Sequence, residues 1–242
     1  MHMKKELNFA QGVRDGVPIG LGYLSVSFSF GLMAVRAGLP VWTAVLISAS
    51  NLTSAGQVAG LSIIAAGGAL IEMIVTQFVI NMRYALMAVS LSQKADASFT
   101  TLRRMTAAFG ITDEIFAVAA SQDGTFGAKY LYGLIVIPFL GWTGGTFLGA
   151  AAGNILPEAI KAALGIAIYG MFLAIIVPPA MTDRGAFLAA LCAAVLSCCL
   201  TYIPALSAIS QGFSVVICAC AAAALAAWLH PIAEDPEGET RT

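Results

Sequence analysis

The sequence predicts an all-α polytopic membrane protein with about seven or eight hydrophobic segments, some of them discontinuous or re-entrant. Of its 242 residues, 59% are hydrophobic and only 10% are charged, whereas a soluble domain carries about a quarter charged residues. Apolar runs of about 18 or more residues recur, each long enough to cross roughly 30 Å of hydrocarbon as a helix. We expect one transmembrane domain over residues 1–230 and an exposed tail over residues 231–242.

The first three segments follow a polar lead-in over residues 1–15. The first segment covers about 17–35 and ends at Arg36 and the turn "AGLP". The second covers about 41–66, and the glycine pair "GG" separates it from the third, at about 69–92. A polar connection follows, "SQKADASFTTLRRM". These interruptions contain turn-forming or charged residues, which are typical of helix ends.

Residues 105–121 are apolar enough to form one helix, although they contain Asp113 and Glu114. Beyond the loop "QDGTFGAK" we predict further segments at about 130–152, 159–180, 185–206 and 209–229. One strip of small residues, Gly141, Gly145, Gly149 and Gly153, has the four-residue spacing that lets two helices approach closely. Its partner is a helix of this chain or of a second subunit.

The distribution of lysine and arginine raises the hypothesis that part of the chain re-enters the membrane, and it leaves open whether segment 41–66 crosses or returns. Cationic residues precede the first segment (Lys4, Lys5, Arg14) and follow the third (Lys94, Arg103, Arg104). Such residues gather on the cytoplasmic side, yet three full crossings would place the two groups on opposite sides. The conflict disappears if segment 41–66 is broken near "NLTSAG" and returns to the side from which it entered. Broken backbone is tolerated where protein or a water-filled cavity covers it.

The break would also suit a zwitterionic ligand. A half-helix N-terminus offers N–H groups to a carboxylate, and unwound carbonyls accept from an ammonium group. The stretch "SASNLTSAGQ" adds polar side chains, and Pro18, Gly20 and Gly22 give the first segment a comparable irregularity. The alternative is that these small and hydroxyl residues only pack helices together.

Arg83, Asp113 and Glu114 are charged residues that lie in apolar surroundings. A charge at the bilayer centre costs at least about 2.5–3.5 kcal/mol, so Arg83 is either functional or a topology anchor near the cytoplasmic end. Asp113 and Glu114 point about 100° apart on a helix. If they are embedded, proton uptake neutralises them and they suit a proton-coupled carrier; the alternative is a surface helix with both acids solvated.

The chain resembles the AzlC family of branched-chain amino acid exporters over roughly residues 8–205. The resemblance rests on the order and spacing of "FAQGVRDGVPIGLGYLSVSFSFGLMAVRAGL", "ISASNLTSAGQVAGLSIIAAGG", "VINMRYALMAVSLS", "GITDEIFAV", "WTGGTFLGAAAGNILP" and "LGIAIYGMFLAIIVP". It implies secondary efflux of hydrophobic amino acids such as valine, leucine, isoleucine or methionine. It also implies a small companion membrane subunit of the AzlD type.

The family's motifs map onto Gln57, onto Asn81 with Arg83, and onto Asp113 with Glu114. Two features depart from its pattern. "LTSAGQ" is more polar than the usual "FAGASQ", which argues against a purely aliphatic substrate. Ala167 stands where the resemblance leads us to expect an acidic residue in the sixth segment.

We therefore predict an exporter of small hydrophobic amino acids in the cytoplasmic (inner) membrane. The predicted substrate site comprises Asn51, Ser54, Gln57, Asn81 and Arg83, with Asp113 or Glu114 as the proton carrier. Rival interpretations are a channel or facilitator for a small neutral solute, a membrane-embedded enzyme, and a structural subunit of another transporter. We predict that the protein is not an enzyme and has no catalytic residue, metal or cofactor. Its two histidines, His2 and His230, are terminal, and no "GxxxxGK" loop for ATP occurs. The net charge of −1 shows no excess of basic residues of the kind that binds nucleic acid.

Overall fold

The computed structural model describes residues 7–153, 155–204, 206 and 208–229. This part of the chain is helical, as predicted, and contains ten helices: α1 Phe9–Arg36, α2 Val41–Ser50, α3 Ser54–Ala65, α4 Leu70–Gln93, α5 Thr101–Phe109, α6 Asp113–Ala120, α7 Ala128–Ala152, α8 Glu158–Thr182, α9 Arg184–Tyr202 and α10 Gln211–Leu229. Five of them (α1, α4, α7, α9 and α10) are long and apolar enough to cross a membrane. The chain divides into two compact units, Met1–Met171 and Phe172–Thr242.

Helix α1 differs from its prediction in two ways. It begins well before residue 17, because Asn8 caps it by accepting a hydrogen bond from the Gln11 amide at 2.9 Å. The predicted irregularity at Pro18, Gly20 and Gly22 is wrong, since the helix runs through all three positions without a break. Gly20 instead serves close packing, because a Cβ there would lie 2.9 Å from a backbone oxygen of α7.

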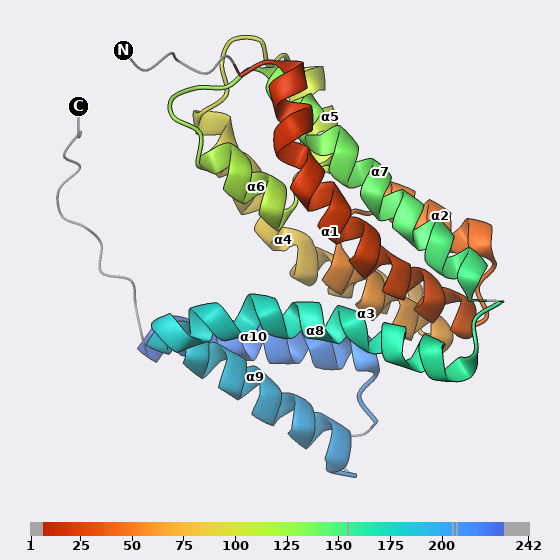
Figure 1. The fold of residues 1–242 in the computed structure, drawn as a ribbon. Coiled ribbons are helices and arrows are strands. Elements are labelled where there is room, and N and C mark those ends of the chain that lie inside the picture. Colours follow the sequence, from red (N-terminus) through yellow and green to blue (C-terminus); the bar gives the residue numbers. More distant parts are fainter. Residues whose placement is uncertain (1–6, 154, 205, 207, 230–242) are drawn as a thin grey trace. The chain divides into compact units, whose positions relative to one another are not determined.

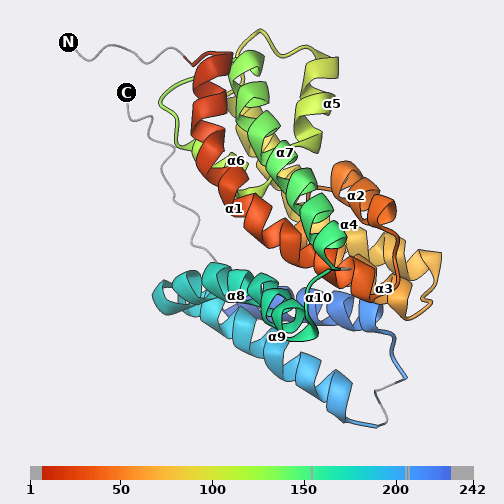
Figure 2. The same ribbon diagram turned by 45° about the vertical axis from the view of Figure 1, so that its right-hand side comes forward.

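Helices α1 and α7 form the central pair of the first unit and lie side by side (Figures 1 and 2). They run in the same direction, since Gly12 lies against the first turns of α7 and Gly31 against Ala150 near its end. The predicted glycine strip faces this contact: Cβ atoms at Gly141, Gly145 and Gly149 would collide with α1 backbone. The partner of the strip is therefore a helix of the same chain.

Segment 41–66 is broken and re-entrant, as expected. Helix α2 runs back beside α7, where Ser48 Oγ lies 2.7 Å from Thr146 Oγ1. After a three-residue break at residues 51–53, α3 returns antiparallel to α4, with Gly56 beside Gln77 and Gly60 beside Met73. The end of α1 and the start of α4 consequently lie at the same end of the unit.

The helix predicted over residues 105–121 is wrong, because the segment forms a second hairpin of α5 and α6. Gly110 ends α5, and Thr112 caps α6 by accepting a hydrogen bond from the Ile115 amide at 3.4 Å. The far end of α6 returns to the loop after α4, where Lys94 Nζ donates to the Ala120 carbonyl at 2.6 Å. The hairpin therefore starts, with α5, and finishes, with α6, near the C-terminal end of α4.

The two hairpins make the first unit an inverted repeat. In each half, a long helix (α1 or α4) is followed by a short helix, a three-residue break and a second short helix. The breaks are Asn-Leu-Thr and Gly-Ile-Thr, and in both the threonine caps the helix that follows. Since α1 and α4 run in opposite directions, the hairpins enter from opposite ends. Such inverted repeats are characteristic of transporters.

Cationic residues gather at one end of this unit: Arg14, Lys94, Arg103, Arg104 and Lys129. Contacts join their segments, since the Tyr130 hydroxyl bonds Asp15 at 3.0 Å and the Ala128 amide bonds Ser98 at 2.9 Å. Arg36 lies at the opposite end of α1. We assign the cationic end to the cytoplasm; Lys4 and Lys5 are outside the described residues.

In the second unit, α9 and α10 pack against each other, and Asp183 caps α9 through the Gly185 amide at 2.7 Å. The single transmembrane domain over residues 1–230 stays a prediction. The tail at 231–242, His2, His230 and the side chain of Ala167 lie outside the described part of the structure.

Candidate functional site

The two breaks are linked through side chains of α1 and α4 in one polar layer inside the first unit. Each is anchored by an aliphatic side chain, Leu52 or Ile111, which is 6% exposed. Each is followed by the first turn of a short helix, where amide groups without helical acceptors leave a partial positive charge. The layer therefore contains the N-termini of α3 and α6 and the C-termini of α2 and α5.

The outer break (residues 51–53) is held by a network of amide side chains. Gln57 is buried and donates from Nε2 to the Asn51 carbonyl at 2.5 Å. Gln77 of α4 donates to the Gly56 carbonyl at 2.7 Å and accepts from Asn81 at 3.0 Å and from Asn51 at 3.4 Å. Gln77, which the sequence did not assign to the site, joins the predicted residues Asn51 and Asn81, and Gln57 joins them through the Asn51 carbonyl.

The remaining predicted residue of α3 is less engaged. Ser54 is the first residue of that helix and is half-buried, and the described part of the chain offers its side chain no hydrogen-bond partner. It lies directly beside the break, where a ligand could reach its hydroxyl group.

The inner break (residues 110–112) is tied to α4 by an ion pair. Arg83 Nη1 lies 2.9 Å and 2.8 Å from the two carboxylate oxygens of Asp113. Arg83 also donates to the Tyr84 hydroxyl at 3.2 Å, while Gln77 of the same helix bonds the outer hairpin at Gly56. Helix α4 therefore connects the two hairpins through neighbouring side chains.

Tyr23 of α1 contacts both breaks. Its hydroxyl donates to Glu114 and lies 2.6 Å from Thr112 Oγ1, at the start of α6. Its ring packs edge-on against Trp142, with centroids 5.2 Å apart, in a buried cluster that includes Leu52. Tyr23 is not among the residues predicted from the sequence, although a tyrosine in an apolar segment needs a partner for its hydroxyl.

The structure separates the two acidic residues, as their helical spacing predicts. Asp113 faces Arg83, whereas Glu114 faces Tyr23, and no lysine or arginine contacts Glu114 among the described residues. The charges of Arg83 and Asp113 cancel, so the polar layer has a net charge of about one negative unit when Glu114 is ionised. Four buried side-chain polar atoms have no hydrogen-bond partner in the part of the chain that is described: Thr76 Oγ1, Asn81 Oδ1, Trp142 Nε1 and Ser210 Oγ.

Reversing the charges of Arg83 and Asp113, singly and together, should show how much their ion pair contributes to the stability of the protein. Arg83→Asp or Asp113→Arg places two like charges together, so we expect each to lower the melting temperature of the purified protein, and the double exchange to restore part of the loss. Both side chains are more than a third exposed (40% and 36%), so the coupling energy should be about 1 kcal/mol or less. A double variant no more stable than the worse single variant would contradict the pairing.

The sequence of this chain is similar to those of other membrane proteins. The family described as AzlC protein matches residues 18–156, which include both hairpins and most of α1 and α7. The chain is 29% identical over 172 residues to the inner membrane protein YgaZ of Escherichia coli K12, covering 68% of this chain and 70% of that protein. It is 31% identical over 181 residues to an uncharacterized membrane protein of Archaeoglobus fulgidus, covering 74% and 79% of the two chains. No solved structure matches significantly.

Proposed function

The chain belongs to the AzlC protein family, and from this premise we propose that it is a secondary transporter exporting small hydrophobic amino acids of the branched-chain type. It is a multi-pass membrane protein, and the predicted inner-membrane location agrees with its relative. The observation that carries the proposal is the pair of broken hairpins that enter from opposite ends and are linked through α4 and Tyr23 in one polar layer. A small AzlD-like subunit is the proposed partner.

The polar layer has the groups that a zwitterion needs. The first turns of α3 and α6 offer amide N–H groups and partial positive charge to the substrate carboxylate. Carbonyl groups of the breaks and the Glu114 carboxylate accept from its ammonium group. Leu52, Ile111 and Trp142 are buried in or near the breaks, and opening of a hairpin would expose their apolar surface to an aliphatic side chain. Asn51, Ser54, Gln57, Asn81 and Arg83 line or support this site.

The inverted arrangement supplies two gates. Moving α2–α3 would open the layer toward the outside, and moving α5–α6 would open it toward the cytoplasm. Tyr23 contacts Leu52 of one hairpin and Thr112 and Glu114 of the other. It is therefore placed to make the state of one gate depend on the other.

Of the two acidic residues, we assign proton exchange to Glu114. Asp113 is paired with Arg83, whereas Glu114 contacts the Tyr23 hydroxyl, so proton exchange at Glu114 would not break an ion pair. Export would then be coupled to inward proton movement: Glu114 takes up a proton from the outside, releases it to the cytoplasm, and the amino acid moves outward.

The test is efflux from cells loaded with leucine-containing dipeptides, measured with and without a co-expressed AzlD-like subunit. We expect Gln57→Ala and Asn81→Ala to reduce leucine efflux at equal protein abundance. Gln122→Ala is the matched control, because Gln122 follows α6 and bonds the Val118 carbonyl outside the layer. Wild-type efflux by the first two variants would remove the site assignment.

The rival function is a channel or facilitator for a small neutral solute, which the few charges at depth would also suit. Counterflow separates the two functions. Preloaded unlabelled leucine should accelerate uptake of labelled leucine into proteoliposomes if the protein is a carrier, whereas a channel gives no such acceleration.

A further inference from the structure

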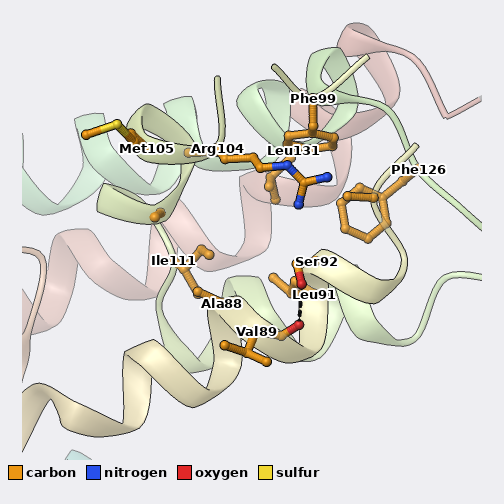
Figure 3. Close-up of a pocket in the computed structure, with 13 residues that line it drawn as sticks. Ala88, Val89, Leu91, Ser92, Phe99, Arg104, Met105, Ile111, Phe126 and Leu131 are labelled. Atoms are coloured by element: carbon orange, nitrogen blue, oxygen red, sulfur yellow. Dashed lines mark hydrogen bonds between the residues drawn. The ribbon is translucent and has the colours of Figure 1, made fainter. Parts of the chain in front are cut away.

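A pocket lies between α4, α5 and α7 on the cytoplasmic side of the polar layer. Its volume is about 330 Å³, within the range of small-molecule sites. The walls are almost entirely apolar, and the larger lining side chains are Leu91, Phe99, Met105, Ile111, Phe126 and Leu131 (Figure 3). No acidic side chain is among the lining residues.

A single cation enters this apolar space. The Arg104 side chain extends from α5 so that its guanidinium group lies among the lining residues (Figure 3), with its carbon 5.9 Å from the centroid of the Phe99 ring. Within residues 7–229, apart from the undescribed positions, the Arg104 guanidinium group contacts no carboxylate and donates to no hydrogen-bond acceptor. Its neighbour Arg103 differs, because that guanidinium donates to the Ser98 carbonyl at 2.7 Å.

The rim of the pocket is apolar and exposed. Val89 is 62% exposed and Met105 is 68% exposed, and both line the opening. Leu86 and Leu102, at the same end of the unit, are also exposed. An exposed apolar rim at the cationic end is better suited to contact the lipid, at the boundary between headgroups and acyl chains, than to contact water.

We propose that this pocket binds an anionic phospholipid of the cytoplasmic leaflet, with an acyl chain against the apolar walls and the phosphate at Arg104. A free amino acid suits the pocket less well, because its ammonium group would find no carboxylate there. The hydroxyl of Ser92, the polar side chain on the α4 wall, already donates to the Val89 carbonyl at 2.6 Å.

The bound lipid would act on the inner hairpin. Ile111 lies both in the pocket wall and in the inner break, and α5 supplies the wall that carries Arg104. An acyl chain packed against these residues holds α5 in place beside α4. This inference concerns lipid binding alone and does not depend on which solute the protein transports.

The test measures lipid binding by the purified full chain in neutral detergent, by native mass spectrometry and thermal shift. We expect phosphatidylglycerol to bind and raise the melting temperature, phosphatidylcholine to do so much less, and inorganic phosphate to have no effect. Arg104→Ala should weaken phosphatidylglycerol binding by about fivefold or more, as expected for one cation at an anionic headgroup. Arg103→Ala removes the same charge outside the pocket and should bind almost as the wild type does.

A filling variant separates loss of binding from loss of folding. Ala108→Phe places a ring in the pocket and should exclude the acyl chain while leaving the melting temperature without lipid unchanged. Equal effects of Arg103→Ala and Arg104→Ala would overturn the proposal, as would equal binding of the two lipids. Stabilisation by leucine that depends on Arg104 would also overturn it, because the pocket would then belong to the transport path.

Discussion

Replacing Gly145 with leucine is expected to prevent folding of the first unit. A Cβ at this position would collide with the Leu24 carbonyl oxygen and Ser27 Oγ of α1. Overpacking of a well-packed core costs about 1–3 kcal/mol, and the cost here should be higher because backbone cannot move aside. We expect the variant to be lost from the monodisperse fraction after detergent extraction, measured by fluorescence-detected size exclusion.

The adjacent glycine provides the control. A Cβ at Gly144 would meet no neighbouring atom within 4 Å, so Gly144→Leu should extract and elute like the wild type. The two variants add the same side chain to the same helix and differ only in the face that carries it. Equal behaviour of the two would mean that α1 does not pack on this face of α7.

Replacing Tyr23 with phenylalanine is expected to lower export about tenfold or more while the protein still folds. The ring and its contacts with Trp142 and Leu52 are kept. The hydroxyl that joins α1 to Thr112 and Glu114 is lost, and an unmet hydrogen bond at such a site costs about 1–3 kcal/mol. The measurement is the initial rate of leucine efflux, normalised to protein abundance.

Tyr132→Phe is the matched control for this variant. The Tyr132 hydroxyl binds Thr106 and the Arg103 carbonyl at the exposed side of α5, away from both breaks. We expect near wild-type efflux from it. If Tyr23→Phe exports leucine as fast as Tyr132→Phe does, Tyr23 does not link the two hairpins.

Much of the fold could be predicted because lipid restricts the choices. Hydrophobic length located α4 and α7, and the charge distribution suggested, without deciding it, that segment 41–66 returns to its own side. The break at Asn51 to Thr53 was recognisable because Asn, Thr and Ser interrupt an otherwise apolar run. Four-residue glycine spacing also predicted close helix contact, although the sequence could not identify α1 as the partner.

The second hairpin escaped prediction because its signal is weaker. Gly110 and Thr112 can both occur inside a helix, and the segment lacks the amide side chains of the first break. Comparison of the two Leu/Ile-Thr steps, at Thr53 and Thr112, would have revealed the repeat. The irregularity expected at Pro18 was wrong because an isolated proline can be accommodated where neighbouring helices support the backbone.

The sequence by itself determined that this is a helical membrane protein with an interrupted second segment, since hydrophobic length and polar interruptions are local properties. Only the tertiary structure decided which polar groups meet. Arg83 and Asp113 are far apart along the chain, as are Tyr23 and Glu114. Their pairing depends on two hairpins folding back from opposite ends onto α4 and α1, and no periodicity within a single segment encodes that.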